Sequence, residues 1–192
     1  EEALIDACNT ELLIRNSRSV DRLIRGANLR YAHARIDDVN FEANRSGLTQ
    51  QSINRFSECT WIHNHKNMNL LGSTGIGKTW LACAFATKAC SKGYKTKFFK
   101  YFEFIALFEK AVDNTIDKQL IKKLMTLDLL IIDDFGLTSI PSAVEGILLD
   151  FIDNFSMRGS LLITSQFSYD IWYEKFNDPT IADAILDRII HN

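Results

Sequence analysis

The segment from residue 72 to residue 79 constrains the fold more strongly than any other part of this sequence. It matches the pattern G-x-x-x-x-G-K-[ST] in full, follows a short apolar run at residues 68–71, and opens a segment with strong helical character. A strand that ends in a tight glycine turn and continues as a helix presents backbone N–H groups that can hold a polyphosphate. The pattern therefore predicts a nucleoside triphosphate site, in which Lys78 contacts the β- and γ-phosphates and the Thr79 hydroxyl binds Mg²⁺. The predicted binding residues are Gly72, Ser73, Thr74, Gly75, Ile76, Gly77, Lys78 and Thr79.

The length and composition of the chain limit the classes of protein to which it can belong. Its 192 residues, of which 46% are hydrophobic, suffice for one α/β domain with a small additional segment. The sequence holds no run of about 18 apolar residues that would predict a membrane-spanning helix, and its N-terminus does not resemble a signal peptide. The four cysteines show no C-x-x-C spacing, which indicates reduced thiols in a cytoplasmic protein. Because the chain starts with Glu1 rather than Met, we expect further residues upstream.

From residue 67 onward, short apolar segments alternate with helical segments. Strands are expected at 67–71, 95–100, 128–132 and 161–164, and helices at 78–92, 102–112, 115–126, 142–157, 169–176 and 180–190. Continuous apolar strands separated by helices are typical of a parallel sheet that is covered on both faces. The sequence thus predicts an α/β fold of the P-loop NTPase class, a three-layer αβα arrangement over residues 67–192. A helical N-terminal segment at 1–35 and a linker at 36–66 would precede it.

The N-terminal helical segment carries arginines on one side and apolar residues on the other. Residues 11–35 hold six arginines and no lysine against two acidic residues, although the whole chain has a net charge of −2. At about 100° per residue, four apolar positions cluster on one side of the helix, namely Leu13, Val20, Ile24 and Ala27. The opposite side carries Arg15, Arg18, Arg22 and Arg25. Such a charged face can simply be solvated, or it can bind phosphate, which would make these four arginines a local DNA-binding surface.

Two carboxylates end the third expected strand. Asp133 and Asp134 directly follow four apolar residues. Because ligands of open parallel sheets bind at the carboxyl ends of the strands, Asp133 is expected to hold Mg²⁺ beside Thr79. Asp134 is expected to orient and deprotonate the water that attacks the γ-phosphate. The pair therefore predicts a hydrolytic site.

Two further polar residues are candidates for catalytic roles. In P-loop ATPases with an additional central strand, a polar residue at the end of the fourth expected strand touches the γ-phosphate or the attacking water. Gln166 fills this position, or in its place Thr164 or Ser165. Arg188 interrupts an apolar helical run, so its guanidinium needs a partner. It either forms a salt bridge with a nearby carboxylate such as Asp187 or Asp183, or stabilises phosphoryl charge in a neighbouring subunit as an arginine finger.

These residues together resemble the AAA+ ATPases of the IstB/DnaC type, and most of all the IstB proteins, the transposition helpers of bacterial insertion sequences. The likeness spans roughly residues 10–192 and is carried by residues 70–79, 128–137, 163–166 and 184–191. It implies an ATPase that uses ATP and Mg²⁺ and forms a homo-oligomer with a trans-acting Arg188. It also implies binding to duplex DNA and assistance to a transposase in target selection. The run at 37–41 leads into the nucleotide pocket in this family, so by analogy Phe41 would pack near the adenine.

The sequence departs from the family pattern at three places. Asp134 stands where many AAA+ proteins have Glu, which predicts slow hydrolysis, and Gln166 stands where Asn is common. The chain also stops at Asn192, before the final strand and the second sensor arginine that such ATPases carry. Two alternatives therefore stay open, a DnaC-like helicase loader and an ATP-gated DNA scaffold with negligible hydrolysis.

Overall fold

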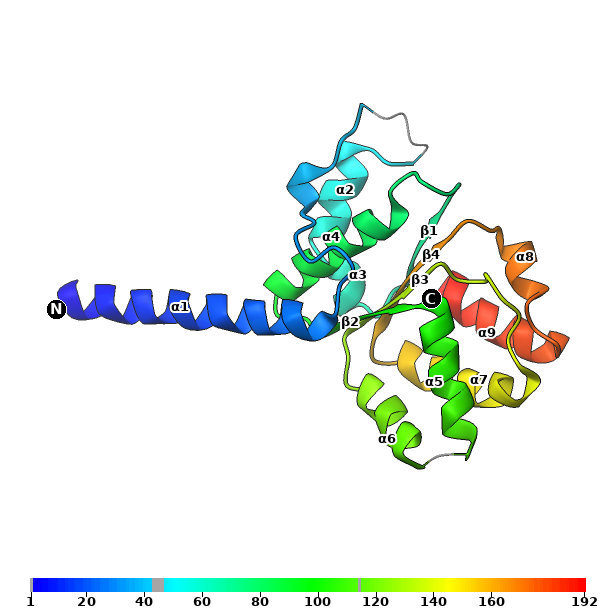
Figure 1. Cartoon of the computed structure of the whole chain (residues 1–192). Coiled ribbons are helices and arrows are strands. Elements are labelled where there is room, and N and C mark those ends of the chain that lie inside the picture. Colours follow the sequence, from blue (N-terminus) through cyan, green and yellow to red (C-terminus); the bar gives the residue numbers. More distant parts are fainter. Residues whose placement is uncertain (1, 43–46, 114) are drawn as a thin grey trace.

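Four parallel strands form the centre of the molecule (Figure 1). The computed structural model of the chain describes residues 2–42, 47–113 and 115–192. The strands are β1 (Met68–Leu71), β2 (Thr96–Lys100), β3 (Leu129–Asp133) and β4 (Ser160–Ser165). They lie in the order β1-β4-β3-β2, and every neighbouring pair is parallel. All residues of β3 and β4 are buried, as expected for central strands covered by helices on both faces. The prediction of a parallel α/β fold is confirmed.

Each face of the sheet packs into its own hydrophobic cluster. Leu129 and Ile131 of β3 point to one cluster, and Leu130 and Ile132 point to the other, because successive side chains of a strand alternate between the two faces. The helices on the first face are α2 (Gln50–Ser57), α3 (Thr60–His63) and α4 (Lys78–Ser91). Those on the second face are α5 (Tyr101–Asp113), α6 (Thr115–Leu124), α7 (Ser142–Ser156), α8 (Tyr169–Tyr173) and α9 (Pro179–His191). This arrangement is a three-layer αβα sandwich.

The N-terminal helix α1 (Glu2–Ala27) extends away from this body for most of its length (Figure 1). Its last turn is anchored, since Ala27 is fully buried and Lys97 Nζ of β2 donates a hydrogen bond to the Gly26 carbonyl at 3.1 Å. The sequence predicted helical structure as far as residue 35, but α1 ends at Ala27. Asn28 takes a left-handed backbone conformation with φ of 55°, which interrupts the helical hydrogen bonding. No helix in the described parts of the chain is long and apolar enough to cross a membrane.

The segment between α1 and β1 holds more regular structure than a linker. It contains the short 3₁₀ helix η1 (Ile36–Asp38) in addition to α2 and α3. A capping box starts α2, in which Thr49 Oγ1 accepts a hydrogen bond from Ser52 N and Ser52 Oγ accepts one from Thr49 N. Residues 43–46 of this segment lie outside the described residues. The helices bring apolar side chains against α4, beside the predicted phosphate-binding loop.

Candidate active site

The predicted phosphate-binding loop joins β1 to α4 and takes a conformation that requires its glycines. Gly72, Gly75 and Gly77 have φ values of 152°, 85° and 90°, a region that residues with a side chain rarely adopt. A Cβ atom on Gly72 would also lie 2.5 Å from Cδ1 of Ile76. Gly77 directly precedes α4, so the loop ends at a helix N-terminus, where free backbone N–H groups favour a bound anion.

Lys78 lies across this loop. Its Nζ atom donates hydrogen bonds to the carbonyl oxygens of Gly72 at 2.8 Å and Ser73 at 2.9 Å. Its ammonium group is therefore held at the loop itself, where its donors can be exchanged for the oxygens of a bound phosphate. The geometry suits the role predicted for Lys78 in binding the β- and γ-phosphates.

Asp133 is fully buried at the carboxyl end of β3, and two hydroxyl groups converge on one of its oxygens. Thr79 Oγ1 donates a hydrogen bond to Asp133 Oδ1 at 2.8 Å, and Thr164 Oγ1 donates another at 2.6 Å. Burial raises the pKa of Asp133, and the hydrogen bonds from Thr164 and Thr79 offset part of that rise. The second oxygen, Oδ2, is buried and has no hydrogen-bond partner among the described residues. A buried carboxylate oxygen without a partner beside a threonine hydroxyl fits Mg²⁺, which prefers oxygen ligands.

Asp134 follows directly and has an unusual backbone conformation. Its φ of 60° lies in the left-handed region, where a residue other than glycine is held at a cost of about 1–3 kcal/mol. The hydroxyl of Thr164 fixes this turn, because Thr164 Oγ1 accepts a hydrogen bond from Asp134 N at 3.0 Å. Across the described parts of the chain, no side chain or backbone group donates a hydrogen bond to the Asp134 carboxylate, which is half-buried at the edge of the sheet. It is free to accept a proton from a water molecule.

The end of β4 contacts the phosphate-binding loop through the side chain of Gln166 and through the backbone of Ser165, whose carbonyl accepts a hydrogen bond from Gly72 N at 3.2 Å. Thr74 Oγ1 donates a short hydrogen bond to Gln166 Oε1, across 92 positions of sequence. The Ser165 hydroxyl has a packing role, because it donates to the Phe135 carbonyl and accepts from Trp172 Nε1. The sequence had named Thr164 as a substitute for Gln166, and missed that its hydroxyl joins the Asp133 carboxylate to the backbone N–H of Asp134. The available signal was a hydroxyl residue inside an otherwise apolar strand.

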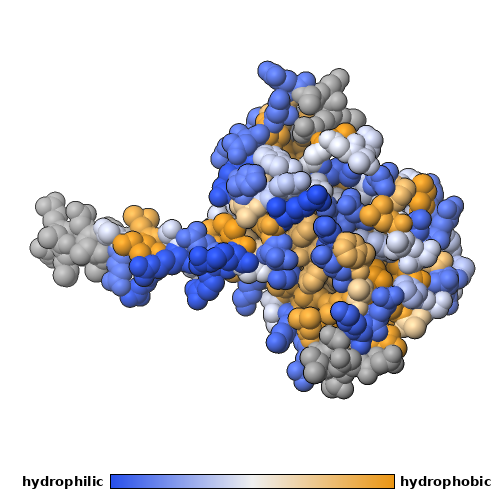
Figure 2. Space-filling view, viewed as in Figure 1, coloured by the Kyte–Doolittle hydropathy of each residue, from blue (hydrophilic) through white to orange (hydrophobic). Residues whose placement is uncertain are grey.

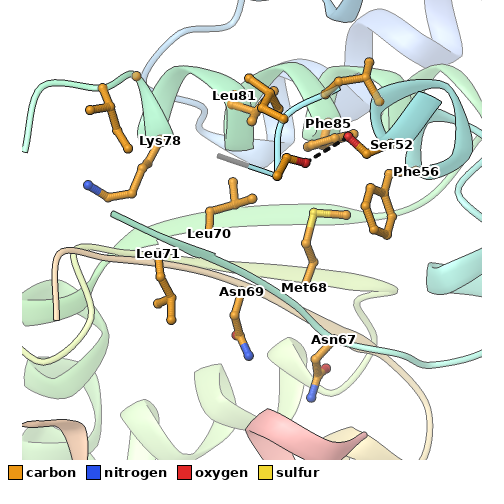
Figure 3. A pocket seen from close by; sticks show the side chains of 15 residues that line it. Ser52, Phe56, Asn67, Met68, Asn69, Leu70, Leu71, Lys78, Leu81 and Phe85 are labelled. Atoms are coloured by element: carbon orange, nitrogen blue, oxygen red, sulfur yellow. Dashed lines mark hydrogen bonds between the residues drawn. The ribbon is translucent and has the colours of Figure 1, made fainter. Parts of the chain in front are cut away.

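A cavity of about 380 Å³ opens beside the loop, between α2, β1 and α4 (Figure 3). Its apolar lining includes Phe56, Met68, Leu70 and Phe85, and Lys78 lies at one end. Figure 3 shows Met68 and Leu70 pointing into the cavity from β1, whereas Asn67 and Asn69 point to the other side of the strand. An apolar cavity with an aromatic ring next to a phosphate site suits a nucleobase.

Phe41 does not lie among the residues that line this cavity. It is 37% exposed, and its place near the adenine stays a prediction. Phe56 of α2 occupies the wall instead, packed edge-to-face against Phe85 with ring centroids 6.4 Å apart.

Arg188 lies at the opposite end of β1 from the phosphate-binding loop. Its Nε atom forms a salt bridge with Asp153 of α7, and its Nη1 atom donates to the Ala184 carbonyl at 2.7 Å. The partner is thus on a neighbouring helix and is neither Asp183 nor Asp187, the carboxylates suggested by the sequence. Asn67, which precedes β1, donates a hydrogen bond to the Arg188 carbonyl at 2.8 Å. Since 33% of its side-chain surface is exposed, Arg188 can be reached by a second molecule.

The predicted arginine surface lies on the projecting helix α1. Arg18, Arg22 and Arg25 are exposed, while Arg15 forms an exposed salt bridge with Glu11, a kind of contact that contributes little to stability. Among the side chains of α1 that the structure describes, residues 10–27, Ala27 near the C-terminal end is the buried one.

The apolar residues in the middle of α1, on its projecting part, are exposed. Leu12, Leu13 and Ile14 are 57%, 69% and 45% exposed, and apolar side chains are visible on the projecting part of α1 in Figure 2. Leu13 belongs to the apolar side of the helix described from the sequence, and it is exposed because it lies on the part of α1 that projects from the body. The projecting helix therefore presents both arginines and unpacked apolar side chains.

Comparisons with known proteins agree on one family. The family model described as an IstB-like ATP binding protein matches residues 2–192. An insertion sequence ATP-binding protein of Sinorhizobium fredii is 41% identical over 132 residues, which cover 69% of this chain and 53% of that relative. A second one from the same organism is 34% identical over 178 residues, which cover 93% of this chain and 72% of the relative. The chain thus spans about half the length of the first relative.

Solved structures show the same fold at lower identity. The crystal structure of the DnaC helicase loader superposes with a TM-score of 0.64 at 20% identity, over 83% of this chain and 95% of the loader. At this identity the likeness extends to the fold alone.

Proposed function

The chain belongs to the family of IstB-like ATP-binding proteins of insertion sequences, and from this premise we propose that it hydrolyses ATP within an oligomer on duplex DNA. In that assembly it would assist a transposase in selecting a target. The observation that carries the proposal is the hydrogen-bonded group Thr79, Asp133, Thr164 and Asp134 at the edge of the sheet beside the phosphate-binding loop.

The chain's own residues have distinct tasks in this hydrolysis. Thr79 Oγ1 and the unpartnered Asp133 Oδ2 would hold Mg²⁺, which when bound neutralises charge on the β- and γ-phosphates. Lys78 exchanges its carbonyl partners for phosphate oxygens. Asp134 takes a proton from water as the water oxygen bonds to the γ-phosphorus and the bond to the departing ADP oxygen breaks. Gln166, held by Thr74, positions the same water or the γ-phosphate.

Hydrolysis is expected to be slow outside an assembly, because Arg188 is held away from the phosphate-binding loop of its own subunit. Arg188 is held at the far end of β1 by Asp153 and Asn67, so its guanidinium is directed away from the loop of its own chain. Its partial exposure supports a contact with the nucleotide of a neighbouring subunit, where an arginine finger is worth about 10³–10⁵ in turnover.

Binding to duplex DNA is supported by the projecting helix α1. Arg18, Arg22 and Arg25 are exposed on it and, within the described residues, form no salt bridge. Arginines of this kind contact phosphates without reading base sequence, which suits a protein that accepts many target sites. Their position on an extended helix lets them reach DNA without moving the ATPase body.

Two other functions remain candidates. Leu12, Leu13 and Ile14 are exposed on the same helix, which favours docking on a protein and hence a helicase-loader role. Asp134 is one methylene shorter than Glu, which favours a scaffold that binds ATP and DNA with negligible hydrolysis. Each alternative predicts a response to duplex DNA that differs from the DNA-stimulated hydrolysis expected of the proposed ATPase.

The test is to measure ATP hydrolysis and particle size, each with and without duplex DNA. We expect a large assembly in which DNA stimulates turnover, and Lys78→Ala should lose ATP-dependent assembly. Lys88→Ala, a change of an exposed lysine on the same helix, is the matched control and should behave as the unmodified chain. Assembly without turnover would favour the scaffold, and neither assembly nor turnover would favour the helicase loader. The transposase role is tested separately, by strand transfer into target DNA with and without the protein.

A further inference from the structure

Asn67 joins three elements through one side-chain amide. Its Nδ2 donates a hydrogen bond to the Arg188 carbonyl at 2.8 Å and lies 3.3 Å from the Ile189 carbonyl. Its Oδ1 accepts a hydrogen bond from Leu161 N at 2.8 Å. The amide therefore connects the start of β1, the start of β4 and the last turn of α9.

The two strands that Asn67 connects lead directly to the candidate active site. Leu71, the last residue of β1, is followed by Gly72 of the phosphate-binding loop. Strand β4 begins at Ser160 and ends beside Gln166, which touches the same loop. Because Arg188 is held at its carbonyl by Asn67 and at its guanidinium by Asp153, the position of its side chain is fixed relative to the sheet.

We propose that Asn67 is a positioning residue that sets where Arg188 is presented to the neighbouring subunit. This inference rests on the proposed trans action of Arg188. An asparagine suits the task because its amide donates and accepts at once. The donor faces carbonyl groups in the last turn of a helix, where orphan carbonyls accept hydrogen bonds and carry negative partial charge.

The substitution Asn67→Asp separates the two halves of this contact. A carboxylate can still accept the hydrogen bond from Leu161 N, but it cannot donate to the Arg188 carbonyl and repels it. The last turn of α9 should then move away from β1 and carry Arg188 with it. A displacement of about 1 Å at a reacting group can cost roughly 100-fold in rate.

The experiment uses mixed oligomers on duplex DNA. A chain with Asp134→Asn keeps the phosphate-binding loop and supplies Arg188 but lacks the catalytic carboxylate, and a chain with Arg188→Ala lacks the arginine but supplies a loop with its catalytic carboxylate. Each is expected to be inactive alone, and mixing should restore turnover at sites that combine both. Asn67→Asp is then added either to the chain that supplies Arg188 or to the chain that supplies the loop.

We expect turnover of the mixture to fall at least tenfold when Asn67→Asp lies in the chain that supplies Arg188. Turnover should change less than about twofold when the substitution lies in the chain that supplies the loop, consistent with an effect exerted through Arg188 alone. Turnover in this second mixture also shows that the Asn67→Asp chain folds. As a matched control, Asn54→Asp changes an asparagine that accepts a hydrogen bond from Gln50 Nε2 at 2.8 Å, and it should have no effect in either chain.

Three results would overturn the inference. If the two parent chains fail to restore turnover when mixed, Arg188 does not act in trans and the proposed assembly fails with it. If they restore turnover but Asn67→Asp has the same effect in both chains, the trans action stands and the positioning role of Asn67 is wrong. A loss confined to the chain that supplies the loop would show that Asn67 serves its own phosphate-binding loop.

Discussion

The hydroxyl of Thr164 is the point at which the candidate site is most sensitive to a small change. Thr164 is fully buried, donates to Asp133 Oδ1 at 2.6 Å and accepts from Asp134 N at 3.0 Å. Thr164→Val keeps the shape and β-branching of the side chain and removes only these two hydrogen bonds. We predict that it lowers both the free energy of unfolding and the rate of ATP hydrolysis.

The size of the stability loss follows from the two bonds. A hydrogen bond to an ionised carboxylate contributes about 1.5–3 kcal/mol, and the Asp134 N–H left without its partner costs about 1–3 kcal/mol. The added methyl group returns about 0.8 kcal/mol through its burial. The net loss is about 3 kcal/mol, which for a chain of this size lowers Tm by roughly 6 to 12 °C.

The effect on hydrolysis has the same origin. Without the hydroxyl, the Asp133 side chain can rotate and the left-handed turn at Asp134 loses the bond that holds it. Displacing a catalytic carboxylate by about 1 Å costs roughly 100-fold in turnover. We therefore expect turnover in the assembled protein to fall between tenfold and a hundredfold.

Thr87→Val is the matched control, since Thr87 is also buried and its hydroxyl donates to the carbonyl of Cys83 at 2.9 Å within α4. A bond to a neutral carbonyl contributes about 0.5–1.5 kcal/mol, most of which the buried methyl group replaces. Urea unfolding of the nucleotide-free chain gives both free energies, and phosphate release gives both rates. Equal destabilisation by the two substitutions, or full turnover in Thr164→Val, would refute the role assigned to the Thr164 hydroxyl.

Three further predictions concern the charges and rings around the site. Burial raises the pKa of Asp133, which means that its ionised form is less stable in the folded than in the unfolded chain. Asp133→Asn should therefore raise the Tm of the nucleotide-free protein at neutral pH, as measured in a thermal melt. The same substitution should abolish turnover. Reversing Arg18 and Arg22 to Glu should weaken duplex binding and make the negative slope of log K against log salt shallower by about 2, since each phosphate contact contributes about −0.9 to that slope. Phe56→Ala should raise the Kd for ATP about 5- to 100-fold in a titration, because stacking of a base on an aromatic ring contributes about 1–3 kcal/mol, whereas Phe41→Ala should raise it less.

Each of these predictions has an outcome that contradicts it. A lower Tm for Asp133→Asn would mean that the buried carboxylate stabilises the fold. Reversal of Lys122 and Lys123, two exposed lysines of α6, is the control for the arginine pair, and an equal loss of DNA binding would remove α1 from the DNA surface. A larger effect of Phe41→Ala than of Phe56→Ala would place the base near Phe41.

The parts of the site that the sequence predicted are those whose residues lie close together along the chain. The glycines and Lys78 occupy one short segment, and Asp133 ends a run of apolar residues, so a local pattern specifies both. The strands were predicted within a residue or two for the same reason. In a parallel sheet the carboxyl ends of all strands lie at the same edge, so the end of β3 comes to lie beside the loop that follows β1.

The features that the sequence missed depend on contacts between distant segments. The wall of the cavity beside the phosphate-binding loop pairs Phe56 with Phe85, and the salt bridge of Arg188 is made with Asp153 of another helix. Neither partner stands out by residue type, because a phenylalanine on a helix and an aspartate on a helix surface are ordinary. The end of α1 was missed because a single left-handed residue, Asn28, ends a helix whose pattern continues beyond it.

The arrangement of the sheet suggests how an assembly on DNA would control hydrolysis. Helix α1 is anchored on β2 through Lys97, and Arg188 is tied to β1 through Asn67, so the two proposed contacts with other molecules act on opposite edges of one sheet. The central strands β3 and β4 carry Asp133 and Thr164. A shift of either edge strand reaches these residues through the backbone hydrogen bonds of the sheet. In the proposed assembly, DNA and a neighbouring subunit would thus act on the same two residues, and removing either should leave the other unable to support full turnover.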